Sequence, residues 1–273
     1  MGIDAKDKQE TIHKVVFQLP IQTFAHVIVS VPALSLIICF VTSVIYQFDQ
    51  VNETVCHVQN LIPSISAITG VSPQRYLWRI VMALQCTPRI TVGFMYYNYW
   101  MGMIKNKCVS EDNMQRFLTL AKVAFYLYMI ENFSLIGTAY IANVDNYPIH
   151  EKLFIAFMVS SLCYQVITIM LFRWSHPQPM LPEDANSYKW KKRFFFSIVT
   201  FTAGLLFFFY RHRFHCDPRA FSVFALCEYG IAFVNMAFHY TGAIDFRDSC
   251  WFVAAPGDNV QETSNNHNGK KVM

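Results

Sequence analysis

Hydroxyl, imidazole and carboxyl side chains stand in the polar segments between apolar stretches of this chain. Ser64 and Ser66 precede the second stretch, His150 and Glu151 precede the fourth, and His212 follows the fifth. A serine hydroxyl can act as a nucleophile, and an imidazole or carboxylate can take its proton as a general base. We nominate these five residues as the candidates for catalysis.

No standard catalytic signature accompanies these residues. The sequence has no G-x-S-x-G, H-E-x-x-H or paired C-x-x-C motif and no Gly-rich phosphate loop, so we expect neither a metal nor another cofactor. His239 and Asp245 are spaced too widely for the glycerolipid acyltransferase pattern. The chemistry must therefore be inferred from individual side chains and their surroundings.

Three arginines lie at the ends of apolar stretches, at the depth of lipid headgroups. Arg75 and Arg79 are at the start of the second stretch, and Arg211 is at the end of the fifth. A planar guanidinium offers several N–H donors that match phosphate and carboxylate oxygens. We nominate the three for binding a phosphorylated lipid headgroup; the alternative is that they only anchor the helix ends at the interface.

Polar and ionisable side chains also occur inside the apolar stretches. A charge near the bilayer centre costs about 2.5–3.5 kcal/mol on insertion scales, so such residues usually face a bundle interior and find partners. Six of them are Arg89, Glu131, Asn132, Glu228, Asn235 and His239. Lys122 falls on the opposite face of the helix from Glu131. We therefore expect Glu131 to pair with Arg79 or Arg89, in contacts that either form a site or hold the helices together.

Long apolar helices must position all these groups. The chain has 273 residues, of which 54% are hydrophobic and 15% charged, a balance too apolar for a soluble domain. A hydrocarbon core needs about 20 apolar residues per helix. Six such stretches are 24–46, 76–103, 117–140, 153–172, 194–210 and 221–239. We predict an all-α polytopic membrane protein, a bundle of six transmembrane helices.

Positive charge between the stretches sets the predicted orientation. Lys and Arg are more numerous in the N-terminal leader, the second and fourth loops and the C-terminal tail than in the other loops. Cytosolic segments carry such an excess. We therefore expect both termini in the cytosol and loops 47–75, 141–152 and 211–220 on the lumenal or outer side. The net charge of +4 reflects this asymmetry and gives no indication of nucleic-acid binding.

The predicted organisation has three parts: a cytosolic leader at 1–23, a transmembrane domain at 24–246 and a disordered cytosolic tail at 247–273. The tail is polar and too poor in apolar residues to bury a core. It ends with Lys270 and Lys271, in the form of a dilysine retrieval signal. The alternative is a pair of solvated lysines.

Cysteine positions give a second indication of topology. Of eight cysteines, only Cys56 and Cys216 fall in the predicted lumenal loops. Because disulfides form in oxidising compartments, we predict a disulfide between them; the alternative is two free thiols. Asn52 begins an N-x-T sequon on the same side, which predicts glycosylation at a site close to the end of the first helix.

Short motifs from residue 20 to 246 follow an order and spacing known from one family. They include Pro73-Gln74-Arg75-Tyr76, Pro88-Arg89, Glu131-Asn132, Ile149-His150-Glu151, Tyr210-Arg211-His212, Glu228-Tyr229 and Asn235-Met236-Ala237-Phe238-His239. In these motifs the chain resembles the post-GPI attachment to proteins factor 2 family. That family is part of a wider group of six-helix membrane proteins that includes the damage-regulated autophagy modulators.

The resemblance implies a Golgi or endoplasmic reticulum protein that is needed for lipid remodelling of GPI anchors. The step is reacylation of the lyso-GPI intermediate with a saturated fatty acid, which keeps GPI-anchored proteins stable at the surface. The implied partners are the GPI-anchor lipid and an acyl donor in the membrane, with partner remodelling enzymes as further candidates. The chain would either catalyse the transfer, with His150 as general base toward the lyso-lipid hydroxyl, or assist another enzyme.

A second hypothesis is a non-catalytic membrane regulator or scaffold, similar to the autophagy-modulator relatives. Arg79, Arg89, Glu131 and Glu228 would then only hold the bundle together. A transporter is less favoured, because the sequence shows no inverted repeat of the kind that transporters use.

Overall fold

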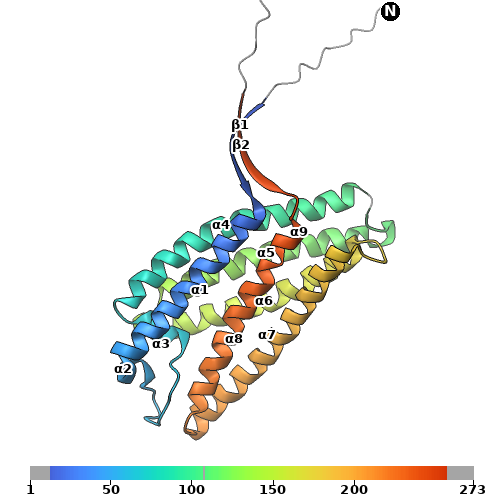
Figure 1. The fold of residues 1–273 in the computed structure, drawn as a ribbon. Helices are drawn as coiled ribbons and strands as arrows, with labels where there is room; N and C mark the ends of the chain where they lie inside the picture. Colours follow the sequence, from blue (N-terminus) through green and yellow to red (C-terminus); the bar gives the residue numbers. More distant parts are fainter. Residues whose placement is uncertain (1–12, 107, 257–273) are drawn as a thin grey trace, which may run out of the picture.

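Long helices form the body of the protein. The computed structural model describes residues 13–106 and 108–256, and in this part six long helices lie together as one bundle (Figure 1). They are α1 (Ile21–Tyr46), α4 (Gln74–Lys105), α5 (Glu111–Tyr140), α6 (Asn143–Ser175), α7 (Pro182–His215) and α8 (Ala220–Tyr240). Each contains one of the predicted apolar stretches and extends beyond it. Short helices α2 (Phe48–Asn52), α3 (Ile65–Gly70) and α9 (Gly242–Asp245) lie in the connections.

Four of the described helices are long and apolar enough to cross a membrane: α1, α6, α7, and α8 with the turn that follows it. This confirms an all-α polytopic membrane protein. Helices α4 and α5 are 32 and 30 residues long, but they carry polar and charged residues, among them Arg89 and Glu131, that the bundle buries. The six spans and the cytosolic location of both termini stay predictions.

Neighbouring helices pack closely inside the bundle and present apolar side chains outside. Gly230 of α8 faces α7 so closely that a Cβ there would lie 2.7 Å from the Phe201 ring. Small residues allow such approach between membrane helices. Exposed apolar side chains such as Ile80, Phe133 and Phe196 cover the outer surface, as expected where lipid tails surround the helices.

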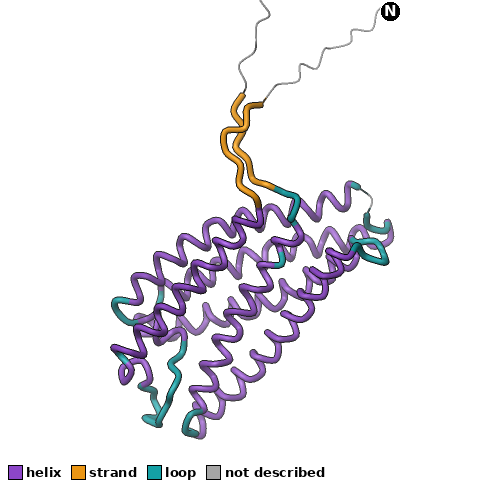
Figure 2. Tube along the Cα trace, in the orientation of Figure 1, coloured by secondary structure: helices purple, strands orange, loops and turns teal. Residues whose placement is uncertain are grey.

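Two strands project from one end of the bundle (Figure 2). β1 (His13–Pro20) and β2 (Cys250–Pro256) pair in antiparallel fashion. This differs from the predicted tail, since Cys250–Pro256 is a strand where disorder was expected. Its Trp251, Phe252 and Val253 are residue types that favour strands, and the leader supplies a matching apolar segment. Lys270 and Lys271 lie outside the described residues, and the three-part division stays a prediction.

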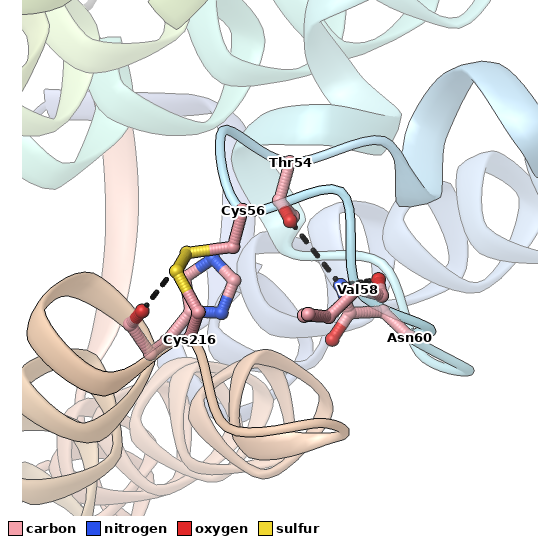
Figure 3. Close-up of a disulfide and its surroundings, with 6 residues drawn as sticks. Thr54, Cys56, Val58, Asn60 and Cys216 are labelled. Atoms are coloured by element: carbon pink, nitrogen blue, oxygen red, sulfur yellow. Dashed lines mark hydrogen bonds between the residues drawn. A yellow bond between two sulfur atoms is a disulfide. The ribbon is translucent and has the colours of Figure 1, made fainter.

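The opposite end carries the predicted disulfide, and we call it the disulfide end. Cys56, in the loop between α2 and α3, is bonded to Cys216 at the end of α7, and the two Cα atoms are 5.4 Å apart (Figure 3). In the same loop, Asn60 Nδ2 donates to the Val58 carbonyl at 3.1 Å and lies 3.4 Å from Thr54 Oγ1. The disulfide ties the loop to the end of α7, and the contacts of Asn60 hold the loop's own conformation.

Helix α8 also contacts the chain between Cys56 and α3. Ser222 Oγ accepts hydrogen bonds from the amides of Leu61 at 2.8 Å and Ile62 at 3.3 Å. Tyr229 Oη donates to the Pro63 carbonyl at 3.2 Å. These contacts fix the chain that leads into α3. They therefore fix the position of α3 relative to α8.

The disulfide predicts a specific thiol count. All eight cysteines lie in the described residues, and six are free. Denatured protein treated with a maleimide of high mass should therefore gain six adducts without reductant and eight with it. The double variant Cys56→Ser/Cys216→Ser is the control and should gain six in both conditions. An equal count for the native protein with and without reductant would show that the bond is absent.

Candidate functional site

A serine and a histidine from distant parts of the chain meet at the disulfide end. Ser66 Oγ lies 2.9 Å from His150 Nε2. Ser66 is the second residue of α3, a helix that begins after Ser64, whose Oγ accepts from the Ala67 amide at 3.2 Å. That contact is an N-cap. The cap therefore orients the first turn of α3 and the Ser66 side chain with it.

His150 is positioned by a break near the start of α6. Asn146 has φ −157° and ψ 93°, which is not helical, and its Oδ1 accepts from the Ile149 amide at 3.2 Å. Asn146 thus caps the longer part of α6, and Pro148 fits the first turn, where its missing N–H is not needed. His150 therefore lies in the first turn after the break, beside the end of α5.

The neighbours of His150 indicate which tautomer of its neutral ring is present. His150 Nδ1 lies 2.8 Å from the Ile141 carbonyl oxygen, which can only accept, so Nδ1 donates. In the neutral imidazole Nε2 is then an acceptor, and the Ser66 hydroxyl donates to it. A hydroxyl, a base and a group that orients the base are the parts of an activated nucleophile.

Glu228 of α8 supports the same segment. Its Oε2 accepts from the Ile65 amide at 2.8 Å, and the side chain is buried. Ile65 directly precedes Ser66, so this carboxylate fixes the backbone next to the candidate nucleophile. Glu228 also lines a cavity together with Asn235 of the same helix.

Two cavities meet at the Ser66–His150 pair. They share Ser66, His150, Phe154 and Glu228 in their linings. The larger, about 220 Å³, is lined elsewhere mainly by apolar side chains, including Ile155, Leu205, Leu206, Phe209, Phe221 and Phe224. The smaller, about 100 Å³, runs from the pair past Met82 and Ile231 to Arg89 and Asn235. A polar centre beside apolar surfaces is the usual character of a site for an amphipathic ligand.

A buried ionic network lies at the inner end of the smaller cavity. Glu131 Oε1 accepts from Arg89 Nη2 at 2.9 Å and lies 2.7 Å from His239 Nε2. Asn235 Nδ2 is 3.2 Å from the same oxygen and 2.7 Å from Ser161 Oγ. Of the two partners predicted for Glu131, the structure selects Arg89. The network joins α4, α5, α6 and α8.

Asn132 lies next to this network without joining it. Its Nδ2 donates to the Cys86 carbonyl at 2.9 Å, a contact between α5 and α4. It therefore strengthens the packing of the same two helices that the Arg89–Glu131 pair joins.

The candidate headgroup arginines have carboxylate partners in the structure. Arg79 Nη2 donates to Asp145 Oδ2 at 2.6 Å, and Arg75 Nη1 lies 3.3 Å from Asp145 Oδ1. Arg211 pairs with Asp217. Sequence reasoning missed both aspartates: Asp217 is six residues from Arg211, whereas Asp145 is 66 residues from Arg79. The pairs with Asp145 are only partly buried. A headgroup role for the arginines stays a prediction.

The remaining predicted residues are distributed around the site. Glu151 lines the larger cavity. His212 lines neither of the two cavities; its carbonyl lies 3.1 Å from Cys56 Sγ. Asn52 is buried, and its Nδ2 donates to the Phe48 carbonyl at 3.0 Å. This contact occupies the atom to which a glycan would attach, and glycosylation stays a prediction. Among the described residues no group of three or more His, Cys, Asp or Glu could hold a metal ion.

Comparisons with known proteins identify similar chains. The family model described as the Frag1/DRAM/Sfk1/Cwh43P N-terminal domain matches residues 20–249. A Drosophila melanogaster protein named post-GPI attachment to proteins factor 2-like is 42% identical over 265 residues, covering 96% of this chain and 81% of that protein. Acyltransferase PGAP2 of Xenopus tropicalis is 36% identical over 244 residues, covering 89% and 94%. No solved structure matches the chain.

Removing one partner of the Arg89–Glu131 pair should strongly destabilise the bundle. Glu131→Leu leaves the buried guanidinium without its counter-charge, which costs about 3–5 kcal/mol. The double variant Arg89→Met/Glu131→Leu should regain much of this loss. Thermal unfolding in detergent measures both. Arg211→Gln, in a pair whose arginine is 49% exposed, is the control and should change stability by no more than about 1 kcal/mol. Equal losses in the single and double variants would contradict the pairing.

Glu228 should act on α3 through its acceptor oxygen. Glu228→Ala leaves the Ile65 amide unpaired, at a cost of about 1–3 kcal/mol, and should increase hydrogen exchange over residues 61–70. Glu228→Gln retains an acceptor oxygen and should keep exchange near that of the native protein. Hydrogen–deuterium exchange with mass spectrometry distinguishes the two. Similar exchange in both variants would remove this role.

Proposed function

Because this chain belongs to the post-GPI attachment to proteins factor 2 family, we propose that it is an acyltransferase of GPI-anchor lipid remodelling. The proposed reaction transfers a saturated fatty acid to the lyso-GPI intermediate and so keeps GPI-anchored proteins stable at the cell surface. The observation that carries the proposal is the Ser66–His150 pair, 2.9 Å apart, where two cavities meet.

The cavities offer apolar surface for an acyl chain and polar groups for the reacting ester. Apolar side chains line most of the larger cavity, where the first part of an acyl chain would lie. Ser66, His150 and Glu228 supply the polar groups at the point where the ester would form. In this proposal the disulfide end faces the lumen, where the phosphoinositol of the GPI anchor lies. Arg75 and Arg79 at that end supply positive charge near the headgroup.

His150 acts as the general base in the proposed reaction. Its Nδ1 donates to the Ile141 carbonyl, so Nε2 carries the electron pair that can take a hydroxyl proton. Transfer of that proton makes the oxygen a stronger nucleophile toward an acyl carbonyl, an effect of typically about 10²–10⁴-fold in rate.

The proposed location is the Golgi apparatus and endoplasmic reticulum membranes. The proposed partners are the GPI-anchor lipid, an acyl donor and other remodelling enzymes. The name acyltransferase in the Xenopus tropicalis relative supports catalysis over assistance to another enzyme.

A non-catalytic regulator or scaffold is the second candidate. The network around Glu131 favours it, because one carboxylate joins several helices as a structural element would. The two candidates differ in what the Ser66–His150 pair contributes. In a scaffold its removal would matter only through abundance.

Restoring the protein to cells that lack it tests the function. Mass spectrometry of the phosphatidylinositol part of GPI-anchored proteins should show lyso-forms, or shedding of the anchored proteins, without it. The native chain should restore two saturated chains. His150→Ala should fail at normal abundance, because the base is lost, whereas the control His212→Ala should restore remodelling. Unchanged anchor lipids in the deficient cells would refute the remodelling role; full rescue by His150→Ala would refute the role of His150.

A further inference from the structure

The Ser66–His150 geometry carries an inference about the path of the acyl group. We propose that Ser66 forms a covalent ester with the acyl chain, so that transfer occurs in two half-reactions instead of directly from donor to acceptor. This inference rests on the proposed transferase function and specifies its chemistry at the same site.

The position of the serine hydroxyl is the first argument. For direct transfer, His150 Nε2 would have to face the hydroxyl of the lyso-lipid. In the structure that nitrogen faces Ser66 Oγ at 2.9 Å, and Nδ1 is held by Ile141. The hydroxyl whose proton His150 is placed to take is therefore that of Ser66. The chain supplies both nucleophile and base, and the base is already oriented.

The meeting of the two cavities is the second argument. Ser66 lines both of them, so a ligand in either cavity would lie beside this residue. A covalent acyl group would remain beside the apolar lining while donor and acceptor headgroups exchange at the polar centre. A single hydroxyl reached from two cavities suits a reaction with two successive lipid substrates.

The first half-reaction uses an acyl ester or thioester as donor. Ser66 Oγ attacks the acyl carbonyl carbon while its proton passes to His150 Nε2. The bond from the carbonyl carbon to the donor oxygen or sulfur then breaks. The departing alcohol or thiol takes the proton from His150, which leaves an acyl ester on Ser66 and a neutral imidazole.

The second half-reaction reverses these proton transfers with a new hydroxyl. The lyso-lipid hydroxyl gives its proton to His150 Nε2 and attacks the ester carbonyl. The bond from the acyl carbon to Ser66 Oγ breaks, and Ser66 regains a proton from His150. No net charge or electron is gained or lost. If water takes the place of the lyso-lipid, the same step releases a free fatty acid.

The test uses the purified full-length protein in detergent with p-nitrophenyl palmitate as donor and without acceptor. We expect release of nitrophenol in a burst that approaches one equivalent per protein, and palmitate on the peptide that contains Ser66. Ser66→Ala should lose both signals. Ser160→Ala is the matched control, since its hydroxyl on α6 bonds only the carbonyls of Ala156 and Phe157, and it should keep both.

A second variant keeps the test valid if Ser66→Ala does not fold. Ser66→Cys should form a thioester, which neutral hydroxylamine cleaves, whereas the ester of the native protein resists that treatment. Transfer of palmitate to lyso-phosphatidylinositol by Ser66→Ala at the native rate, with no acylated peptide in the native protein, would overturn the covalent step and leave the transferase function intact. Absence of transfer by the native protein would overturn the proposed function itself.

Discussion

The carboxylate of Glu131 lies where four helices of the bundle come together. Its Oε1 contacts Arg89 from α4 and Asn235 and His239 from α8, while Asn235 extends the network to α6 through Ser161. A charge in such a place is stable only when its partners are complete. The relative positions of these four helices, and with them the smaller cavity, therefore depend on this carboxylate and its partners.

The length of the apolar stretches was sufficient to predict the long helices. The cost of burying a charge was sufficient to predict that Glu131 pairs with an arginine. They were not sufficient to place α3 or the strand β2, because short elements depend on contacts from distant segments. Ser66 and His150 are 84 residues apart, and no catalytic signature in the sequence links them. The cap at Ser64, the break at Asn146, and contacts from distant segments such as Glu228 to Ile65 bring their side chains together.

The Arg79–Asp145 pair at the disulfide end has a structural role. Arg79 and Asp145 tie the turn between α5 and α6 to α4, since Arg79 also donates to the Tyr140 carbonyl at 2.7 Å. The same turn places the Ile141 carbonyl within hydrogen-bond distance of His150 Nδ1. Arg75 and Arg79, which the sequence suggested as ligand contacts, thus help to set the position of His150. The sequence could not separate these roles, because Asp145 becomes a neighbour of Arg79 only after folding.

The disulfide also bears on the order of biosynthesis. Cys56 and Cys216 are separated by 160 residues, so the bond cannot form until α7 has been synthesised. Ser222 and Tyr229, which hold the segment before α3, are made later still. A growing chain therefore carries Ser66 and His150 through the translocation machinery before the contacts that fix α3 exist. Assembly of the Ser66–His150 pair is thereby delayed until nearly the whole protein has entered the membrane.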